Sequence, residues 1–589
     1  MAATNLSSGT GGGAGAAGAP GATGPLRNVA THAALKATAV PTVSGDSIAT
    51  QGALAAADGG AGLFKWIIGA RPADDATFTI WHNTDATGYF SRVWDGRNAT
   101  YAWAGLAAAS TVVQHNAALT VFAGLNVEIE KFYTGITASL NVPANTFLYA
   151  VVPGRGFRAD TLTNTILALG AGASVTNLDL DSGITAMVRD NTFSNAGLVQ
   201  LSNGCRLSRL RLKNARACGI GGYNVTNIYI DDVVIDGAQN KALFTQVCFD
   251  MKISRVTVKN CLNDGIKIHT RDGTITNVQG YKVYVRDCTL DYSAVTLTVD
   301  TLAMELWGGL TTFQNNPHIS GIDVIGPAAQ ATGGFWGISF DTVNGGLVDD
   351  CRVDGGVGGL QLGLEAAGCK FTEFRNCYVR RYKATGLSIS NTNCTNITAT
   401  GCTFREAIGF TGVYGIQAVI GSGHVFERCF FKDAGARNIF LNAAGNGTVV
   451  EKCKFYVSQS SAQPIGVYIA GAVTGGYITD CLFAPFVEAG ETGTAFSMGA
   501  VDAGQALNWT FRGNTLNGAL ASTGAVSGTV ITSYGGGGGH LYSGTRVLNN
   551  TGASAAQYDT GPASVFDNNF CPVVNRTAGN IDLLVGRNS

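Results

Sequence analysis

Apolar and polar residues alternate in a short pattern that returns about every 25 residues along most of the chain. One copy reads Val348-Asp-Asp-Cys351-Arg-Val353, with apolar residues on both sides of a marker position and polar residues between them. The clearest markers are the cysteines Cys351, Cys377, Cys402, Cys429, Cys453 and Cys481. An alternation of period two is typical of a β-strand with one buried face. The pattern therefore predicts a series of short strands.

The marker position continues beyond these cysteines in both directions. It holds aliphatic residues, a cysteine or asparagines at Leu178, Leu210, Val233, Val256, Cys288, Ile322, Asn514, Asn550 and Asn569. A repeat of this length indicates a stacked architecture, and each unit has too little apolar surface to fold alone. We predict an all-β fold, a parallel β-helix of about 13–15 coils over residues 166–575. A C-terminal tail would follow at residues 576–589.

Composition supports a stacked β-structure. Only 13% of the 589 residues are charged, about half the usual share. A net charge of -1 gives no indication of nucleic-acid binding or of attraction to an anionic membrane. No apolar run is long enough for a transmembrane helix, and the N-terminus does not have the pattern of a signal peptide. We expect no cofactor.

The chain contains 14 cysteines. Because the markers point inward on successive coils, we predict a core ladder of buried, reduced thiols and no disulfide framework. No Cys-x-x-Cys pair exists, so a metal site is not expected.

Residues 1–97 differ from the repeat. Residues 1–25 are rich in glycine and alanine and predict a flexible leader, or a docking peptide that becomes ordered on a partner. Residues 26–97 predict a small β-rich module with a short helix at 29–36 and strands near 62–66, 74–80 and 88–96. Residues 98–165 predict a capping helix from Ala99 to about Phe122, followed by the first strands of the solenoid.

Several motifs of the front module resemble a known family. The segments VATHAALKA, GDSIAT, AADGGAGLFKW, ADDATFTI and GYFSRVWDG, in this order, resemble the module that precedes the β-helix in bacteriophage tailspikes and related depolymerases. The resemblance implies a right-handed, pectate-lyase-like β-helix, a homotrimer, and a bacterial surface polysaccharide as partner. It also implies a place in the virion tail, assembly in the host cytoplasm, and attachment to tail or adaptor proteins through residues 1–97. The family's Gly-Asp-Gly-x-x-Asp-Asp stretch is absent, and residues 98–105 stand in its place.

Compared with the regular spacing of the repeat, extra residues cluster between residues 265 and 337. On a solenoid, binding sites form where the loops are locally longer. Aligning the strands there predicts one outward row with Lys267, Glu305, Ser339 and Gln361. A second outward row holds His269, Trp307 and Asp341. Glu305 and Asp341 lie one coil and two residues apart, which places their Cα atoms roughly 8 Å apart.

Two carboxyl groups at such a separation suit inverting glycoside hydrolysis, so Glu305 and Asp341 are the predicted catalytic pair. Trp307 would stack on a sugar ring. Four further side chains are predicted to bind substrate, namely Lys267, His269, Gln361 and Gln246. The alternative is that the two acids have no catalytic role, because outward acids on a β-helix are usually only solvated. Other candidate acids are Asp264, Asp272 and Glu365, of which the first two suit turns.

The resemblance implies a tailspike receptor-binding protein that recognises a bacterial surface polysaccharide, which is O-antigen, capsule or exopolysaccharide, and the carboxylate pair predicts that the protein hydrolyses it. Three alternatives remain open at this point. One is a non-catalytic adhesin, another is a structural fibre or baseplate part, and the third is a polysaccharide lyase in which His269 is the base.

Overall fold

A computed structural model describes residues 27–585 of the chain, with gaps. The gaps are 57, 59, 108–109, 161–163, 191–193, 270–281, 298–299, 310–312, 328–333, 364–367, 410–411, 420, 443–445, 458–464, 471–472, 486–496, 503–505, 517–528, 535–545, 549–550, 553–564 and 568–583. The predicted leader, the markers Asn550 and Asn569, and the candidate acids Asp272 and Glu365 lie outside the described residues. The chain divides into two compact units, residues 1–107 and 108–589.

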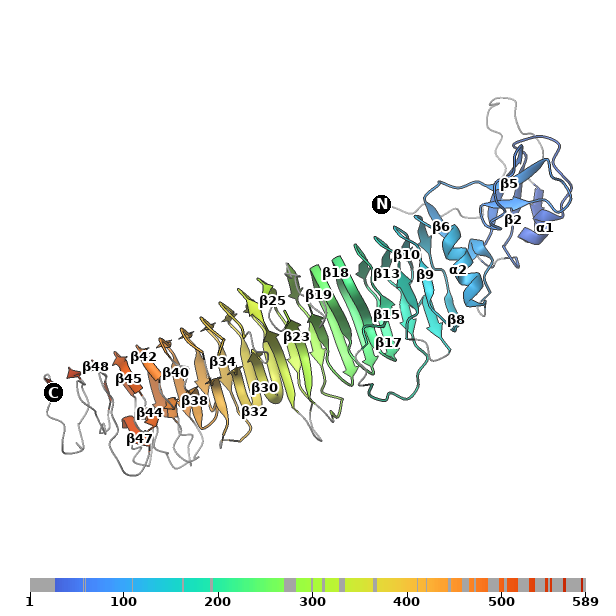
Figure 1. The fold of residues 1–589 in the computed structure, drawn as a ribbon. Helices are drawn as coiled ribbons and strands as arrows, with labels where there is room; N and C mark the ends of the chain where they lie inside the picture. Colours follow the sequence, from blue (N-terminus) through green and yellow to red (C-terminus); the bar gives the residue numbers. More distant parts are fainter. Residues whose placement is uncertain are drawn as a thin grey trace, which may run out of the picture. The chain divides into compact units, whose positions relative to one another are not determined.

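The first unit contains a five-stranded sheet and a short helix (Figure 1). The strands are β1 (Arg27–Val29), β2 (Ser47–Thr50), β3 (Gly62–Ile68), β4 (Thr79–Trp81) and β5 (Gly88–Arg92), in the order β1-β2-β3-β5-β4. Helix α1 (His32–Lys36) begins at Thr31, whose hydroxyl accepts a hydrogen bond from the backbone N–H of Ala34. Strand β6 (Asn98–Thr100) comes later in the chain.

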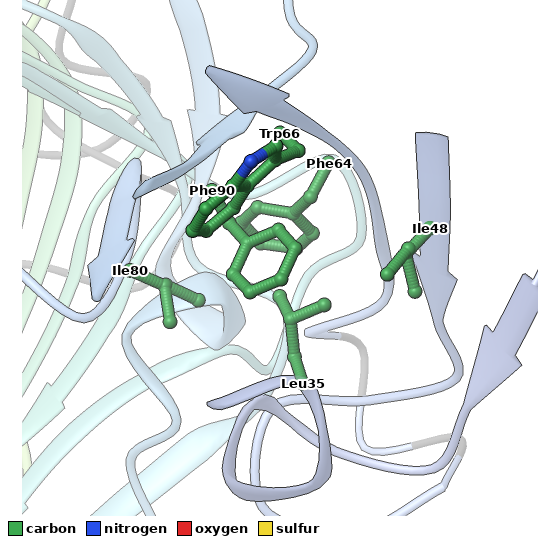
Figure 2. Close-up of a cluster of buried hydrophobic side chains, with 6 residues drawn as sticks. All are labelled: Leu35, Ile48, Phe64, Trp66, Ile80 and Phe90. Carbon is green, nitrogen blue, oxygen red and sulfur yellow. The ribbon is translucent and has the colours of Figure 1, made fainter. Parts of the chain in front are cut away.

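The core of this unit is a cluster of six apolar side chains from the sheet and the helix, each at most 1% exposed (Figure 2). They are Leu35, Ile48, Phe64, Trp66, Ile80 and Phe90. The sequence predicts a strand at 74–80, but the structure has one only from Thr79. The carboxylate of Asp75 accepts hydrogen bonds from the backbone N–H groups of Thr77, Phe78 and Thr79, which favours a turn over a strand.

The predicted helix from Ala99 to Phe122 is wrong in its first half. The structure has a 3₁₀ helix, η1 (Tyr101–Ala104), which ends at Gly105 with a φ of 66°. Helix α2 (Val112–Val121) begins only after Thr111, which forms a capping box with Gln114.

The second unit is a parallel β-helix with three strands in most coils, each hydrogen-bonded to the equivalent strand of the next coil (Figure 1). The first face is built from β7 (Asn126–Glu128), β10 (Phe147–Tyr149), β13 (Ser174–Thr176), β16 (Arg206–Ser208), β18 (Cys218–Ala238), β19 (Leu243–Cys261), β21 (Val283–Arg286), β25 (His318–Ser320), β29 (Leu347–Asp349), β31 (Glu373–Arg375), β33 (Thr398–Thr400), β36 (Val425–Glu427), β39 (Val449–Glu451), β42 (Val473–Thr479), β45 (Ala506–Arg512), β48 (Arg546–Leu548), β50 (Val565–Asp567) and β51 (Leu584–Val585). The predicted parallel β-helix is confirmed. Its stack begins at β7, two coils before the first marker, so the described strands form a longer stack than 13–15 coils.

The second face contains β8 (Phe132–Ile136), β11 (Gly156–Ala159), β14 (Asp179–Asp181), β17 (Arg211–Ala215), parts of β18 and β19, β22 (Thr289–Asp291), β26 (Asp323–Ile325), β30 (Arg352–Leu362), β32 (Tyr378–Ile389), β34 (Thr403–Arg405), β37 (Phe430–Lys432), β40 (Lys454–Val457), β43 (Leu482–Pro485), β46 (Thr515–Leu516) and β49 (Thr551–Gly552). A short extra pair joins β24 (Gln314–Asn315) to β28 (Val343–Asn344).

The third face carries the candidate site. It contains β9 (Leu140–Val142), β12 (Leu167–Leu169), β15 (Gly197–Gln200), parts of β18 and β19, β20 (Ile266–His269), β23 (Thr301–Trp307), β27 (Phe335–Asp341), the ends of β30 and β32, β35 (Tyr414–Ala418), β38 (Arg437–Asn442), β41 (Ile465–Ala470), β44 (Ser497–Asp502) and β47 (Thr529–Tyr534). Helix α2 lies against β9 at the start of this face. No helix in the described part of the chain is long and apolar enough to cross a membrane.

The marker cysteines form the predicted ladder between the first and second faces. The residue before each marker adopts a left-handed backbone, for example Asn376 with a φ of 52° and Lys452 with a φ of 52°, and this bend joins the two strands. From Cys377 to Cys481, each marker thiol then donates to a carbonyl of the preceding coil, as Cys429 Sγ does to Ala399 O at 3.3 Å. Asn514 continues the ladder, since its Nδ2 donates to Ile478 O at 2.8 Å.

All thirteen described cysteines are buried and free of disulfides. Burial raises the pKa of the Cys248 and Cys261 thiols to about 12. Because the reagent cannot reach a buried thiol, we expect these thirteen cysteines to resist iodoacetamide at pH 8 in the folded protein and to react fully in guanidinium. Peptide mapping by mass spectrometry measures this, and modification of the marker cysteines without denaturant would contradict the ladder.

Candidate functional site

Three strands on consecutive coils of the third face bring the candidate residues together. Lys267 of β20 pairs with Glu305 of β23, and Glu305 pairs with Ser339 of β27. In the neighbouring row, Trp307 pairs with Asp341. This register is the one that the alignment of the repeats predicts. Glu305 and Asp341 therefore lie diagonally on adjacent coils.

The remaining candidates extend the same two rows. Gln361 pairs with Ser339 one coil further along. His269 lies between Gln246 on the preceding coil and Trp307 on the following one. The structure thus groups all seven sequence-derived candidates on one face. Their catalytic and binding roles stay predictions.

The site residues lie in the two rows that the sequence predicts to face outward, but the two acids are not solvated as outward acids on a β-helix usually are. Glu305 is 7% exposed and Asp341 is 2% exposed. Ser339 is fully buried, and its hydroxyl has no hydrogen-bond partner among the described residues. Lys267 and Trp307 are only partly buried. Charged groups withdrawn from water in this way must be compensated by neighbours.

The carboxylate of Glu305 has two such neighbours. It forms an ion pair with Lys267 Nζ, and it lies 3.3 Å from His269 Nε2. Lys267 Nζ also donates to Asp264 Oδ2 at 3.2 Å. The other oxygen of Asp264 accepts a hydrogen bond from the backbone N–H of Leu302 at 3.0 Å. Lys267 therefore bridges two carboxylates on adjacent coils.

This arrangement sets the charge states of the site. Burial by itself raises the pKa of Glu305, but the hydrogen bond from His269 and the Lys267 ammonium outweigh it and lower the pKa to about 2. Burial lowers the pKa of Lys267, and the charges of Glu305 and Asp264 more than reverse this, so the net pKa is raised. Burial lowers the pKa of His269, against the pull of Glu305. At neutral pH we therefore assign an ionised Glu305, a protonated Lys267 and a neutral His269.

Aromatic rings surround the histidine. The His269 ring lies 4.6 Å from the Trp307 ring and 5.3 Å from the Phe244 ring, centroid to centroid, edge to face in both cases. Trp307 stands in register between His269 and Asp341 and retains exposed surface. A sugar ring that stacks on Trp307 would thus lie close to both carboxyl groups of the predicted pair.

Polar residues that directly precede the strands of this face lie beside the candidate site. The prediction from the sequence omitted most of them. Asn240 and Lys241 precede β19, and Asn263 and Asp264 precede β20 in the same way. Asn263 Nδ2 donates to Asn240 Oδ1 at 3.3 Å, so the two pairs are linked across coils. Asp264 was considered a turn residue, but it is 7% exposed and bound to Lys267. The signal in the sequence was the repeat of an Asn-plus-charge pair before the strand.

A loop residue, Arg189, also reaches this region, and no repeat signal marks it.

Within the described residues, no group of three or more His, Cys, Asp or Glu side chains is arranged to hold a metal ion. The site as described therefore consists of carboxylates, cations and aromatic rings.

The lowered pKa of Glu305 predicts a pH dependence of stability. Its carboxylate stabilises the folded state fully above its unfolded pKa of about 4.5, and this contribution is lost as the pH falls through about 2. We expect the difference in melting temperature between the native protein and Glu305→Gln to be constant above about pH 5 and to shrink between about pH 4.5 and 2. Calorimetry of both proteins from pH 7 to pH 2 measures it. A difference that stays constant over the whole range would contradict the ion pair.

Comparison with known proteins gives neighbours at the level of structure. They include a tailspike of the Acinetobacter baumannii bacteriophage Fri1, described as a capsular polysaccharide depolymerase, at 13% identity and a TM-score of 0.26, with 87% of this chain and 76% of that chain covered. The tailspike of Acinetobacter phage vb_AbaP_AS12 is 12% identical, with a TM-score of 0.35 and coverage of 77% and 75%. A GH87 alpha-1,3-glucanase of Streptomyces thermodiastaticus strain HF3-3 is 13% identical, with a TM-score of 0.30 and coverage of 82% and 73%.

No protein-family model matches the chain. No curated protein matches it either. The TM-scores are low, so these likenesses carry no argument about function. The parallel strand register of the chain itself establishes the fold.

Proposed function

We propose that this chain is a phage tailspike that recognises a bacterial surface polysaccharide and hydrolyses it at Glu305 and Asp341. The observation that carries the proposal is the strand register, which sets the two carboxyl groups diagonally on adjacent coils beside the partly exposed ring of Trp307. Their Cα atoms are roughly 8 Å apart, and a similar separation of the two carboxyl groups would leave room for the water molecule of an inverting hydrolase.

The charge state of Glu305 suggests its role, and Asp341 takes the other role by elimination. Glu305 is ionised at neutral pH, so it cannot donate a proton, and it acts as the base that accepts one from the attacking water. Asp341 then protonates the leaving glycosidic oxygen. In the net reaction, water is added across the glycosidic bond. Glu305 gains one proton and Asp341 loses one, and exchange with solvent restores both groups. In this proposal Gln246, Gln361 and Lys267 contact hydroxyl or acidic groups of the sugars.

The assignment as a tailspike is supported by the order of motifs in residues 29–96 and by the parallel β-helix that follows them. In this proposal the chain is a homotrimer in the virion tail, attached to tail or adaptor proteins through residues 1–97 and assembled in the host cytoplasm. The chain by itself carries the seven site residues on one face, so a complete site within one subunit is part of the proposal.

A polysaccharide lyase is the second candidate, and the state of His269 favours it. Burial keeps this imidazole neutral, and Glu305 lies 3.3 Å from its Nε2. A neutral histidine can remove the proton next to a uronate carboxylate. A double bond then forms, and the glycosidic oxygen leaves as a hydroxyl after taking a proton from solvent. Lys267 would neutralise the carboxylate of the substrate in that reaction.

One experiment separates these functions. Purified protein is incubated with surface polysaccharide from a susceptible bacterial strain, while new reducing ends and the absorbance of unsaturated uronate are followed. New reducing ends without absorbance support the hydrolase, and absorbance shifts the assignment to the lyase. Binding without new ends leaves a non-catalytic adhesin, and absence of binding rejects a glycan-recognition role.

A further inference from the structure

The loop after β14 places a guanidinium group beside the Glu305 network. Arg189 lies in this loop, and its Nη2 donates to Asn263 Oδ1 at 3.0 Å. Asn263 directly precedes Asp264, whose carboxylate is bound to Lys267. The loop itself is held on this face, since the backbone N–H of Asp190 donates to Gln239 O at 2.9 Å. Arg189 thus forms an edge of the candidate site.

The hydrogen-bonding capacity of Arg189 is only partly used. Its Nε and Nη1 are buried, and neither has a hydrogen-bond partner among the described residues. The nearby carboxylate of Asp264 is already bound to Leu302 N–H and Lys267 Nζ. Burial lowers the pKa of Arg189, and the charges of Asp264 and Asp300 only partly oppose this. The described residues therefore do not fully compensate the cation.

A more deeply buried arginine, Arg92 of the first unit, is 4% exposed and shows what full compensation looks like. In the first unit, Arg92 donates from Nε to Thr77 O at 2.9 Å and from Nη1 to Ala61 O at 3.0 Å. Its Nη2 lies 3.0 Å from His32 Nε2. Arg92 thus has a partner at each of its three nitrogens, whereas Arg189 has one at Nη2 alone within the described residues.

We infer that Arg189 binds a carboxylate of the glycan, so that the ligand of this site is an acidic polysaccharide. The inference rests on the proposed function and adds to it the chemical class of the ligand. A carboxylate supplies both the hydrogen-bond acceptors and the opposite charge that a partly buried guanidinium requires. A neutral sugar would supply hydrogen-bond acceptors but no negative charge. Arg189 is thereby a specificity-determining residue, and Glu305 and Asp341 keep their roles.

The test uses the polysaccharide that the native protein binds, in its natural form and after chemical reduction of its carboxylates to alcohols. Binding of both forms is measured by calorimetry for the native protein, Arg189→Gln and Arg189→Lys. Arg211→Gln is the matched control, because Arg211 is an exposed arginine on β17. Melting temperature and oligomeric state are recorded for each variant.

We expect the native protein and Arg211→Gln to prefer the natural polymer by about tenfold or more, which is the size of a charge-assisted hydrogen bond. Arg189→Gln should bind both forms alike, and Arg189→Lys should retain part of the preference. Equal binding of both forms by the native protein, or a full preference in Arg189→Gln, would overturn the inference while leaving glycan recognition intact. If Arg189→Gln does not fold, the native protein and Arg189→Lys still decide the outcome.

Discussion

Replacing Glu305 with glutamine is expected to lower the rate of polysaccharide cleavage by roughly 10²- to 10⁴-fold, which is the usual contribution of a general base. Glutamine has nearly the same shape and keeps a hydrogen bond to Lys267 or His269, but it cannot accept a proton from water. Binding of the polymer should persist, because Trp307 and the two glutamines of the site are unchanged. Initial rates of reducing-end formation, together with affinity for the intact polymer, measure the two effects separately.

A matched acid elsewhere on the solenoid provides the control. Glu373 on β31 pairs with Arg375 at the surface, and its side chain is 36% exposed. Glu373→Gln should therefore cleave at the native rate. Asp341→Asn should lose activity to a similar degree as Glu305→Gln, since acid and base act in one step. Native activity in both site variants would exclude the predicted pair and leave the ion pair of Glu305 a structural feature only.

Replacing Phe431 with alanine is expected to destabilise the β-helix by about 3–5 kcal/mol. Phe431 belongs to a column of buried phenylalanines on successive coils, in which its ring centroid lies 5.3 Å from that of Phe404 and 4.9 Å from that of Phe455. The column continues from Phe455 to Phe483 at 4.6 Å. Alanine would open a cavity between two rings that cannot collapse, because the strand spacing is held by the backbone ladders.

An exposed phenylalanine gives the reference for this experiment. Phe371 is 61% exposed, so Phe371→Ala should change stability by no more than about 0.5 kcal/mol. Unfolding in guanidinium, followed by tryptophan fluorescence for the native protein and both variants, measures the difference. Similar midpoints for Phe431→Ala and Phe371→Ala would show that the column contributes little to stability.

The repeat pattern was sufficient for the architecture and for the neighbours of each candidate residue. Because strands in a parallel β-helix stack in register, aligning the strands that follow the longer loops is enough to place Lys267, Glu305 and Ser339 beside one another correctly. The same rule predicted the thiol ladder. Asn514 is part of the ladder because its side-chain amide donates to Ile478 O, the carbonyl equivalent to the one that accepts from the Cys481 thiol.

The local rules failed where a side chain decided between two backbone conformations. The apolar spacing of residues 99–122 predicted one helix, but Gly105 ends the first turn and the capping box of Thr111 starts a new helix. Likewise, the carboxylate of Asp75 replaces the first residues of a predicted strand with a turn. Both outcomes depend on hydrogen bonds that apolar periodicity does not report.

By itself, the sequence determined the period, the inward and outward faces, and the order of the candidate residues along the solenoid. Only the tertiary structure decided that Glu305 and Asp341 are buried, and that His269 and Lys267 together lower the pKa of Glu305. It also brought Arg189 beside Asp264, over a separation of 75 positions in the chain. The physical reason is that burial and charge state depend on which loops and turns pack around a side chain, and such contacts between distant segments leave no periodic signal in the sequence.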